Sequence, residues 1–441
     1  MFFVARHVKL VIFFTSAMCL SLVNTPIPVL HSSTELLAFF FLLSEIKHYS
    51  YHKRMLKQTI LWHIMILMLI AMLVLFVYSP HYLSVHGFIV LFKTEILVKY
   101  FVVVYAFMAL EKEKDLKYVY RYSLVALSVL TLFAIDNLIL GRCDFVSDMM
   151  KDRGFFTAMD NAGQDMGERY SYYDDRFRVQ AMFLLAFDYG YVCAVMFLFY
   201  WYGLLKKIIP RGQGLYALFC CLFGIFTCNC RTVLFCLLIS LMFFYYSVYG
   251  KRIIKYMFML LFSFVLIYMS SSNFSKNVNE RIISIVVQND NVGGSSLVMR
   301  AVQYATVLSY VQGHELFGRG KDFFLIDMGW QDGRDFLVDP DLQGIEGVLL
   351  NLILERGFVG VLFWFSFYAG LFFYFRKNRK YCDKTASIGM TLVVYYFIYA
   401  NMTGEMGCVY PTMLLLGIIV KEVYFAKKSQ VVICNNIIEK K

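Results

Sequence analysis

Long apolar runs constrain this chain more than any other feature of its sequence. Several reach about 18 residues, long enough for a helix to cross the hydrocarbon core of a membrane. Of the 441 residues, 60% are hydrophobic and 17% are charged, whereas soluble domains are near half apolar and a quarter charged. The runs are continuous, unlike the short alternating strands of a transmembrane barrel. The sequence therefore predicts an all-α, polytopic membrane protein.

We expect about twelve transmembrane helices in a single membrane domain over residues 1–441. No small-residue cleavage site follows the first run, so we interpret it as a retained helix rather than a signal peptide. The predicted spans are 8–25, 27–45, 59–79, 84–110, 118–140, 179–203, 214–229, 231–250, 253–271, 346–375, 385–402 and 409–426.

The net charge of +11 comes from short basic clusters between the apolar runs. With these spans, the clusters all fall on one side, which the positive-inside rule makes cytoplasmic. This pattern predicts a bilayer partner, no nucleic acid, and a multi-pass membrane protein with both termini cytoplasmic. The clusters are 47–57, 111–117, 206–211, 251–255, 376–380 and 427–428.

Two long loops, about 141–178 and 272–345, fall on the extracytoplasmic side. Loops of this length are usually functional or disordered. The second contains an amphipathic helix at about 295–311, followed by a glycine-punctuated turn at 313–324. The predicted apolar stripe of this helix consists of Leu297, Ala301, Val302, Tyr304, Ala305 and Leu308.

Four arginines face the extracytoplasmic side in this topology: Arg176, Arg178, Arg231 and Arg300. Guanidinium groups bind phosphate through paired hydrogen bonds, so the set suggests recognition of an anion. Other interpretations remain open. Arg231 could be an interfacial anchor, and the first two could pair with the aspartates at 174 and 175.

Charged residues within predicted spans are a further group of candidates. Lys93 and Asp188 could face the same site, because buried charge in a span suggests function. Glu95 and Lys99 are four residues apart and can form a helical ion pair. Glu346 stands at a helix start, where the macrodipole favours its ionised form, so it suits either a base or a helix cap.

The remaining motifs exclude several kinds of chemistry. The eleven cysteines lie mostly in apolar runs and are interpreted as small buried residues. Cys228 and Cys230 are too close together, and too isolated, for a zinc site. The sequence contains no glycine-rich nucleotide loop and no H-E-x-x-H motif. We therefore expect no cofactor and no metal.

Three stretches resemble the O-antigen polymerase and O-antigen ligase superfamily. "CRTVLFCLLIS" is similar to its serine-arginine-small motif at the start of a span. "SSLVMRAVQYATVLSYVQGHELFGRG" is similar to its arginine-bearing loop helix with a following Gly-x-Gly. "EGVLLNLILERGFVGVLFW" resembles the pattern His-Asn-x-Tyr-Leu-x-x-Leu-x-Glu-x-Gly-x-x-Gly. The motifs cover roughly 225–375, and the layout covers most of the chain.

The resemblance implies a glycosyltransferase of the plasma (inner) membrane that acts on undecaprenyl-diphosphate-linked glycan. Glu346 and Gly347 stand where ligases carry histidine and asparagine, which favours a polymerase of surface polysaccharide such as O-antigen or capsule. In that role Arg231 and Arg300 would hold the diphosphate, Glu346 would be the base, and Arg178 and Lys93 would be secondary anion contacts. Implied partners are a chain-length regulator and a flippase. The alternatives are an O-antigen-type ligase and a lipid-linked oligosaccharide flippase.

Overall fold

A computed structural model describes residues 49–110, 115–142, 172–173, 176–183, 185–252, 255, 297–328, 342, 347–404 and 409–438. Apart from the two-residue strands β1 (Tyr172–Tyr173) and β2 (Arg176–Phe177), which pair antiparallel, the regular elements in these residues are helical. The predicted spans 8–25, 27–45 and 253–271 lie outside the described residues, as do most of the two long loops.

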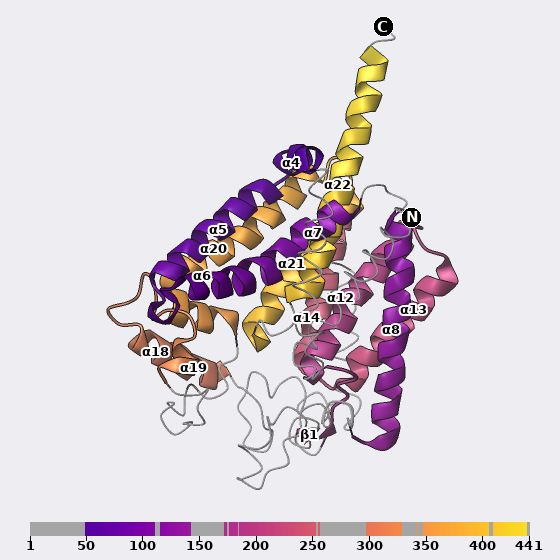
Figure 1. Cartoon of the computed structure of the whole chain (residues 1–441). Helices are drawn as coiled ribbons and strands as arrows, with labels where there is room; N and C mark the ends of the chain where they lie inside the picture. The colour runs from indigo at the N-terminus through magenta and orange to yellow at the C-terminus, as the bar shows by residue number, and fades with distance from the viewer. Residues whose placement is uncertain are drawn as a thin grey trace.

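The helices form an up-and-down bundle in which every predicted span that is described coincides with a helix (Figure 1). They are α4 (Tyr49–Lys57), α5 (Leu61–Val77), η3 (Pro80–Tyr82), α6 (Val85–Leu91), the π-helix η4 (Phe92–Tyr100), α7 (Phe101–Ala109), α8 (Asp115–Leu140), α12 (Ala186–Leu205), α13 (Arg211–Thr227), α14 (Arg231–Tyr249), α18 (Leu297–Tyr310), α19 (Phe323–Ile326), α20 (Val348–Asn378), α21 (Asp383–Thr403) and α22 (Val409–Ile438).

Within the described residues, four helices are long and apolar enough to cross a membrane: α8, α14, α20 and Val409–Gln430 of α22. The membrane character is therefore supported, but the predicted number of twelve spans is not confirmed. The composition of the central helices partly explains why fewer helices are apolar enough to qualify as spans. The tyrosines of α12 and α21, such as Tyr200 and Tyr395, are fully buried in the bundle and lower the hydropathy of helices that contact mainly protein.

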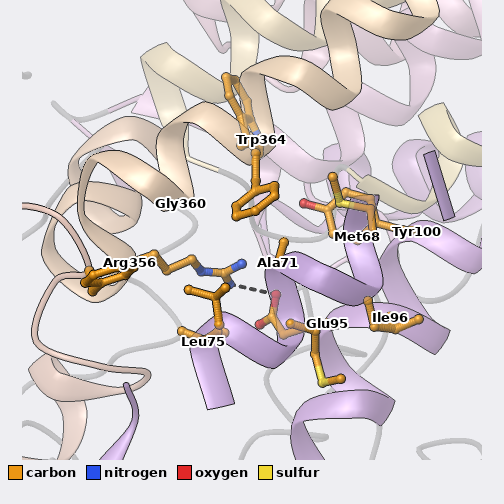
Figure 2. Close-up of a pocket in the computed structure, with 13 residues that line it drawn as sticks. Met68, Ala71, Leu75, Glu95, Ile96, Tyr100, Arg356, Gly360 and Trp364 are labelled. Carbon is orange, nitrogen blue, oxygen red and sulfur yellow. Dashed lines mark hydrogen bonds and ion pairs between the residues drawn. The ribbon is translucent and has the colours of Figure 1, made fainter. Parts of the chain in front are cut away.

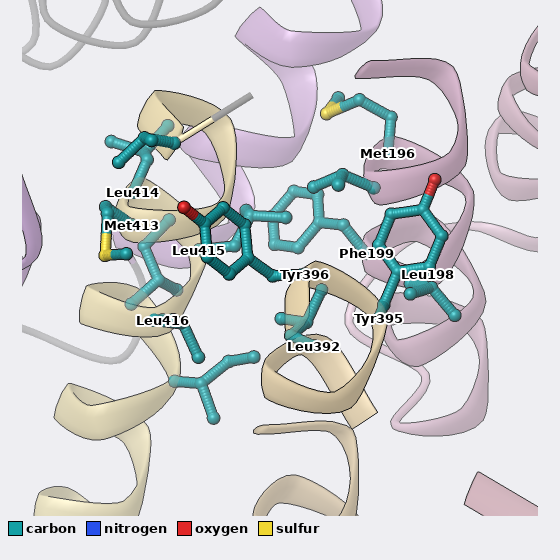
Figure 3. Packing of buried hydrophobic residues seen from close by; sticks show 14 of the residues in the cluster. Met196, Leu198, Phe199, Leu392, Tyr395, Tyr396, Met413, Leu414, Leu415 and Leu416 are labelled. Atoms are coloured by element: carbon teal, nitrogen blue, oxygen red, sulfur yellow. The ribbon is translucent and has the colours of Figure 1, made fainter. Parts of the chain in front are cut away.

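The core of the bundle lies where α12, α21, α22 and α7 meet. Figure 3 shows Met196 and Phe199 of α12 facing Leu392 and Tyr396 of α21 and the run Met413–Leu416 of α22. A Cβ added at Gly417 of α22 would lie 2.3 Å from the carbonyl oxygen of Val103 in α7. This glycine therefore allows the two backbones to approach closely, as small residues do in membrane helix pairs.

The four described basic clusters gather at one end of the bundle, here called the basic end. The Lys206 ammonium lies 3.4 Å from the Glu422 carboxylate, Arg379 donates to the Ser247 carbonyl, and Lys421 contacts Met55. These contacts join the clusters at 49–57 and 206–211 to α22 shortly before residues 427–428, and the cluster at 376–380 to the last turn of α14. This grouping agrees with the predicted alternation of the helices.

The predicted loop helix is present, and its predicted apolar stripe forms the exposed face of the helix where burial is described. On α18 the residues Val302, Tyr304 and Leu308 are exposed, whereas Gln303 and Val307 are buried and Arg300 is half-buried. The opposite face carries Arg300 and Gln303 together with the apolar Val307, and it packs on α20 and α21.

Candidate functional site

Arg300 binds the end of α21. Its guanidinium donates to the backbone carbonyl of Asn401 at 3.2 Å and to that of Met402. Carbonyls at the C-terminal end of a helix carry partial negative charge, so a cation is stabilised there. We call this end of the bundle, opposite the basic end, the arginine end.

Arg231 lies at the same end, as the first residue of α14. The Sγ of Cys236, little more than one turn further along α14, lies 3.9 Å from the Sδ of Met402. The Met402 carbonyl also accepts a hydrogen bond from Arg300 of α18. The first turns of α14 and the start of α18 therefore both contact the end of α21.

Arg178 and Asp188 join this group from the other side of α14. Both act electrostatically on the thiol of Cys230, which directly precedes Arg231. The adjacent Val179 N–H donates to the Thr227 carbonyl at 3.2 Å, which anchors the segment to the turn between α13 and α14. The structure therefore brings Arg178, Asp188, Arg231 and Arg300 to one end of the bundle.

The other predicted site residues, Glu346, Arg176 and Lys93, are not placed with this group by the described contacts. Glu346 lies outside the described residues. Its neighbour Gly347 has a φ of +110°, and an added Cβ would lie 2.9 Å from the Asn401 oxygen that binds Arg300. Arg176 pairs through its backbone with Tyr173, and its side chain is outside the described part. Lys93 lies on η4, whose Glu95 contacts Lys321 in the loop after α18 at 3.9 Å.

A second charged group, missed by the sequence analysis, lies between η4, α20 and the loop after α18. We call Glu95, Lys99, Lys321, Glu355 and Arg356 the ion cluster. The Arg356 guanidinium lies 2.7 Å from Glu95 (Figure 2), and the Lys321 ammonium lies 3.1 Å from Glu355 and 3.9 Å from Glu95. The predicted pair of Glu95 with Lys99 is confirmed at 3.7 Å.

The ion cluster borders a pocket between α5, η4 and α20. Figure 2 shows Met68 and Leu75 of α5 facing Trp364 of α20 across this pocket, with Arg356 and Glu95 on its polar wall. The pocket encloses about 480 Å³, including its open mouth. The Nε of Arg356 and the Nε1 of Trp364 are buried there without a hydrogen-bond partner.

α20 is interrupted directly after the ion cluster. Gly357 has φ 60° and ψ −165°, which is not helical. The loop after α18 supplies acceptors for the N–H groups that the break releases. Phe358 donates to the Glu315 carbonyl at 2.9 Å, and Val359 donates to the Leu316 carbonyl at 3.0 Å. Such partners make a break tolerable inside a membrane protein.

The same loop also satisfies carbonyls on the other side of the break. Arg319 N–H donates to Leu354 at 2.8 Å, and Gly320 N–H donates to the Glu355 carbonyl at 3.0 Å. The Arg319 Nε donates to the carbonyl of Tyr310, the last residue of α18, at 2.7 Å. The loop therefore fastens α18, and Arg300 with it, to the break in α20.

The arginine end gathers guanidinium groups, a side-chain type that can bind anions through paired hydrogen bonds. Three guanidinium groups come from segments far apart in the sequence, and no group of three His, Cys, Asp or Glu suited to a metal ion occurs in the part of the chain that the structure describes. No family model matches the sequence, and no curated protein matches it either.

Proposed function

We propose that this protein is a polymerase of surface polysaccharide that uses undecaprenyl-diphosphate-linked oligosaccharide units as donor. The observation that carries this proposal is the gathering of Arg178, Arg231 and Arg300 at one end of a membrane bundle. Positive charge at the end of a membrane domain suits a diphosphate attached to a lipid, because the lipid places the phosphates at that level.

In the proposed reaction, a hydroxyl oxygen of one lipid-linked unit attacks the anomeric carbon of the growing chain. The bond from that carbon to the diphosphate oxygen breaks, and its electron pair leaves with the undecaprenyl diphosphate. Arg231 and Arg300 would stabilise the charge on the leaving diphosphate. Glu346 would accept the hydroxyl proton as a general base.

The proposal is tested by deleting the gene and measuring the size of surface and lipid-linked glycans. We expect surface glycan of a single repeat unit, restored to polymer by the wild-type gene but not by Arg300→Ala or Arg231→Ala. Arg211→Ala is the matched control, because Arg211 is exposed at the first turn of α13, near the basic end. Polymer of normal length in the deletion strain would refute the proposal, and full-length chains held on the lipid carrier would indicate a ligase.

A lipid-linked oligosaccharide flippase is a second candidate, favoured by the break in α20 and the adjoining ion cluster. Discontinuous helices and charged groups in the membrane often line transport sites. A flippase would leave single units on the cytoplasmic face when the gene is deleted. The same deletion strain therefore separates the two functions.

A further inference from the structure

The single charge of α18 lies on its buried face, and its exposed face carries no charge. Arg300 is its single charged residue, and it lies on the face that packs on the bundle together with the buried Gln303 and Val307. These positions are three and four residues apart and so share one face. A helix between protein and water places its charges outward, so water does not explain this pattern.

The outward face of α18 is apolar and open. Val302 is 41% exposed, Tyr304 is 36% exposed and Leu308 is 47% exposed, and Leu316 directly beyond the helix is 61% exposed. The other outward residues, Ala301, Ala305 and Ser309, are small and uncharged. A continuous apolar face of this kind marks a surface that contacts a partner or a membrane.

The position of α18 along the bundle shows which partner fits. α5 has 17 residues, is apolar after His63 and ends at Val77, and it spans about 25 Å, close to the thickness of the hydrocarbon core. Directly beyond it, the Tyr78 ring stacks on Phe317 at 3.9 Å, and Ser79 Oγ accepts from the Lys321 N–H at 2.9 Å. The loop after α18 is therefore fastened where the apolar part of α5 ends. Figure 1 shows α18 and α19 beyond that end of α5 and α6.

Exposed apolar side chains lie on both sides of this boundary. Leu73 and Val77 of α5, and Leu83 and Val85 directly after it, are exposed. They belong to the surface that an apolar bundle presents to lipid. α18 continues this surface with a face that carries no charge.

We propose that α18 is an interfacial helix whose face of Val302, Tyr304 and Leu308 lies in the acyl-chain boundary of the bilayer. Helices with one apolar face lie in this way in the plane of a membrane. As a consequence that rests on the proposed function, Arg300 on the opposite face is held at the depth of the lipid headgroups. That is the depth at which the diphosphate of a lipid-linked glycan lies.

Photo-cross-linking of the full-length protein in its native membrane tests this proposal. The photoreactive amino acid benzoylphenylalanine replaces Val302 or Leu308, with Ile70 on the exposed face of α5 as lipid-facing reference and the exposed Glu315 as water-facing reference. We expect phospholipid adducts by mass spectrometry from Val302 and Leu308 at a yield like that from Ile70 and well above that from Glu315. Adducts from Ile70 alone, or cross-links from Leu308 to a second copy or another protein, would overturn the proposal.

A second measurement covers the case in which a bulky replacement disturbs the fold. Leu308→Cys and Glu315→Cys are exposed to a water-soluble maleimide in membranes opened to both sides. We expect Glu315→Cys to react and Leu308→Cys to remain largely unmodified, and equal reaction would contradict the interfacial position. Lipid contact is measured here without glycan synthesis. Lipid adducts together with normal polymer in the deletion strain would thus refute the polymerase alone. Absence of lipid adducts from α18, together with loss of polymer in the deletion strain, would refute the interfacial helix alone.

Discussion

Arg356 of α20 donates a hydrogen bond of 2.7 Å to Glu95 of η4, from a position 261 residues further along the chain. Both side chains are largely withdrawn from solvent, with 16% and 4% of their surfaces exposed. Charges withdrawn from water are expensive unless they are paired. The pair therefore fixes how α20 and η4 pack beside the pocket.

Removing one partner of this pair is expected to cost stability. Glu95→Gln should lower the free energy of unfolding by about 3 kcal/mol, because Arg356 then keeps a buried charge with a weaker acceptor. The measurement is thermal unfolding of the purified protein in detergent, with Glu315→Gln as the exposed control. The double variant Glu95→Gln with Arg356→Met should recover part of the loss. A double variant less stable than either single variant would show that the pair is not coupled in this way.

Gly357 is expected to tolerate no side chain. Its φ of 60° disfavours other residues, and an added Cβ would lie 2.4 Å from the Leu316 carbonyl carbon. Gly357→Ala should therefore destabilise the protein by about 2 kcal/mol or more. Gly370→Ala in the same helix is the matched control, since nothing lies within 4 Å of its added Cβ. We expect that control to be neutral or stabilising by up to about 1 kcal/mol. Equal unfolding temperatures for the two variants would argue against the clamp between the loop and α20.

The sequence predicts those features that depend on neighbours along the chain. The described parts of the predicted spans are helical because a membrane helix needs a continuous apolar run, whereas α4 lies in a basic cluster that was not predicted to be a helix. The pair of Glu95 and Lys99 was predictable because residues four apart meet on a helix. The arginines of the arginine end were found because positive charge on that side of a predicted topology is unexpected.

Contacts between distant segments were not predictable in the same way. No local pattern joins Glu95 to Arg356 or Lys321, since their contact depends on how α20 packs against η4. The sequence pattern identified the apolar stripe of α18 but did not predict that this stripe would be the exposed face. In this bundle Arg300 lies inward because the end of α21 offers it carbonyl partners, which a sequence pattern does not show.

The ion cluster should remain charged over a wide range of pH. Burial opposes the charge on Lys321, but Glu355 and Glu95 outweigh it and raise the pKa of this ammonium above its ordinary value. A raised pKa gives a stabilising contribution that is complete below the unfolded pKa of about 10.4 and is lost as the pH rises through the still higher folded pKa. Lys321→Met should therefore be less stable than wild type by the same amount from pH 6 to pH 9. Unfolding temperatures of both proteins across this range test it, and a difference that shrinks below pH 9 would contradict the raised pKa.

The orientation of the bundle can be measured directly with two new cysteines. Gly212 is exposed at the basic end, where an added Cβ meets nothing within 4 Å, and His314 is exposed in the turn after α18. If the basic end is cytoplasmic, a membrane-impermeant maleimide added to cells with accessible plasma membranes should label His314→Cys and leave Gly212→Cys unmodified. Labelling of the protein with its natural cysteines alone is the background, to which the six buried ones at 193, 220, 221, 228, 230 and 236 should add little. Opening the membranes should then make Gly212→Cys reactive, which shows that its protection came from the bilayer. The opposite labelling pattern would place the arginine end in the cytoplasm, where the proposed extracytoplasmic polymerase could not act.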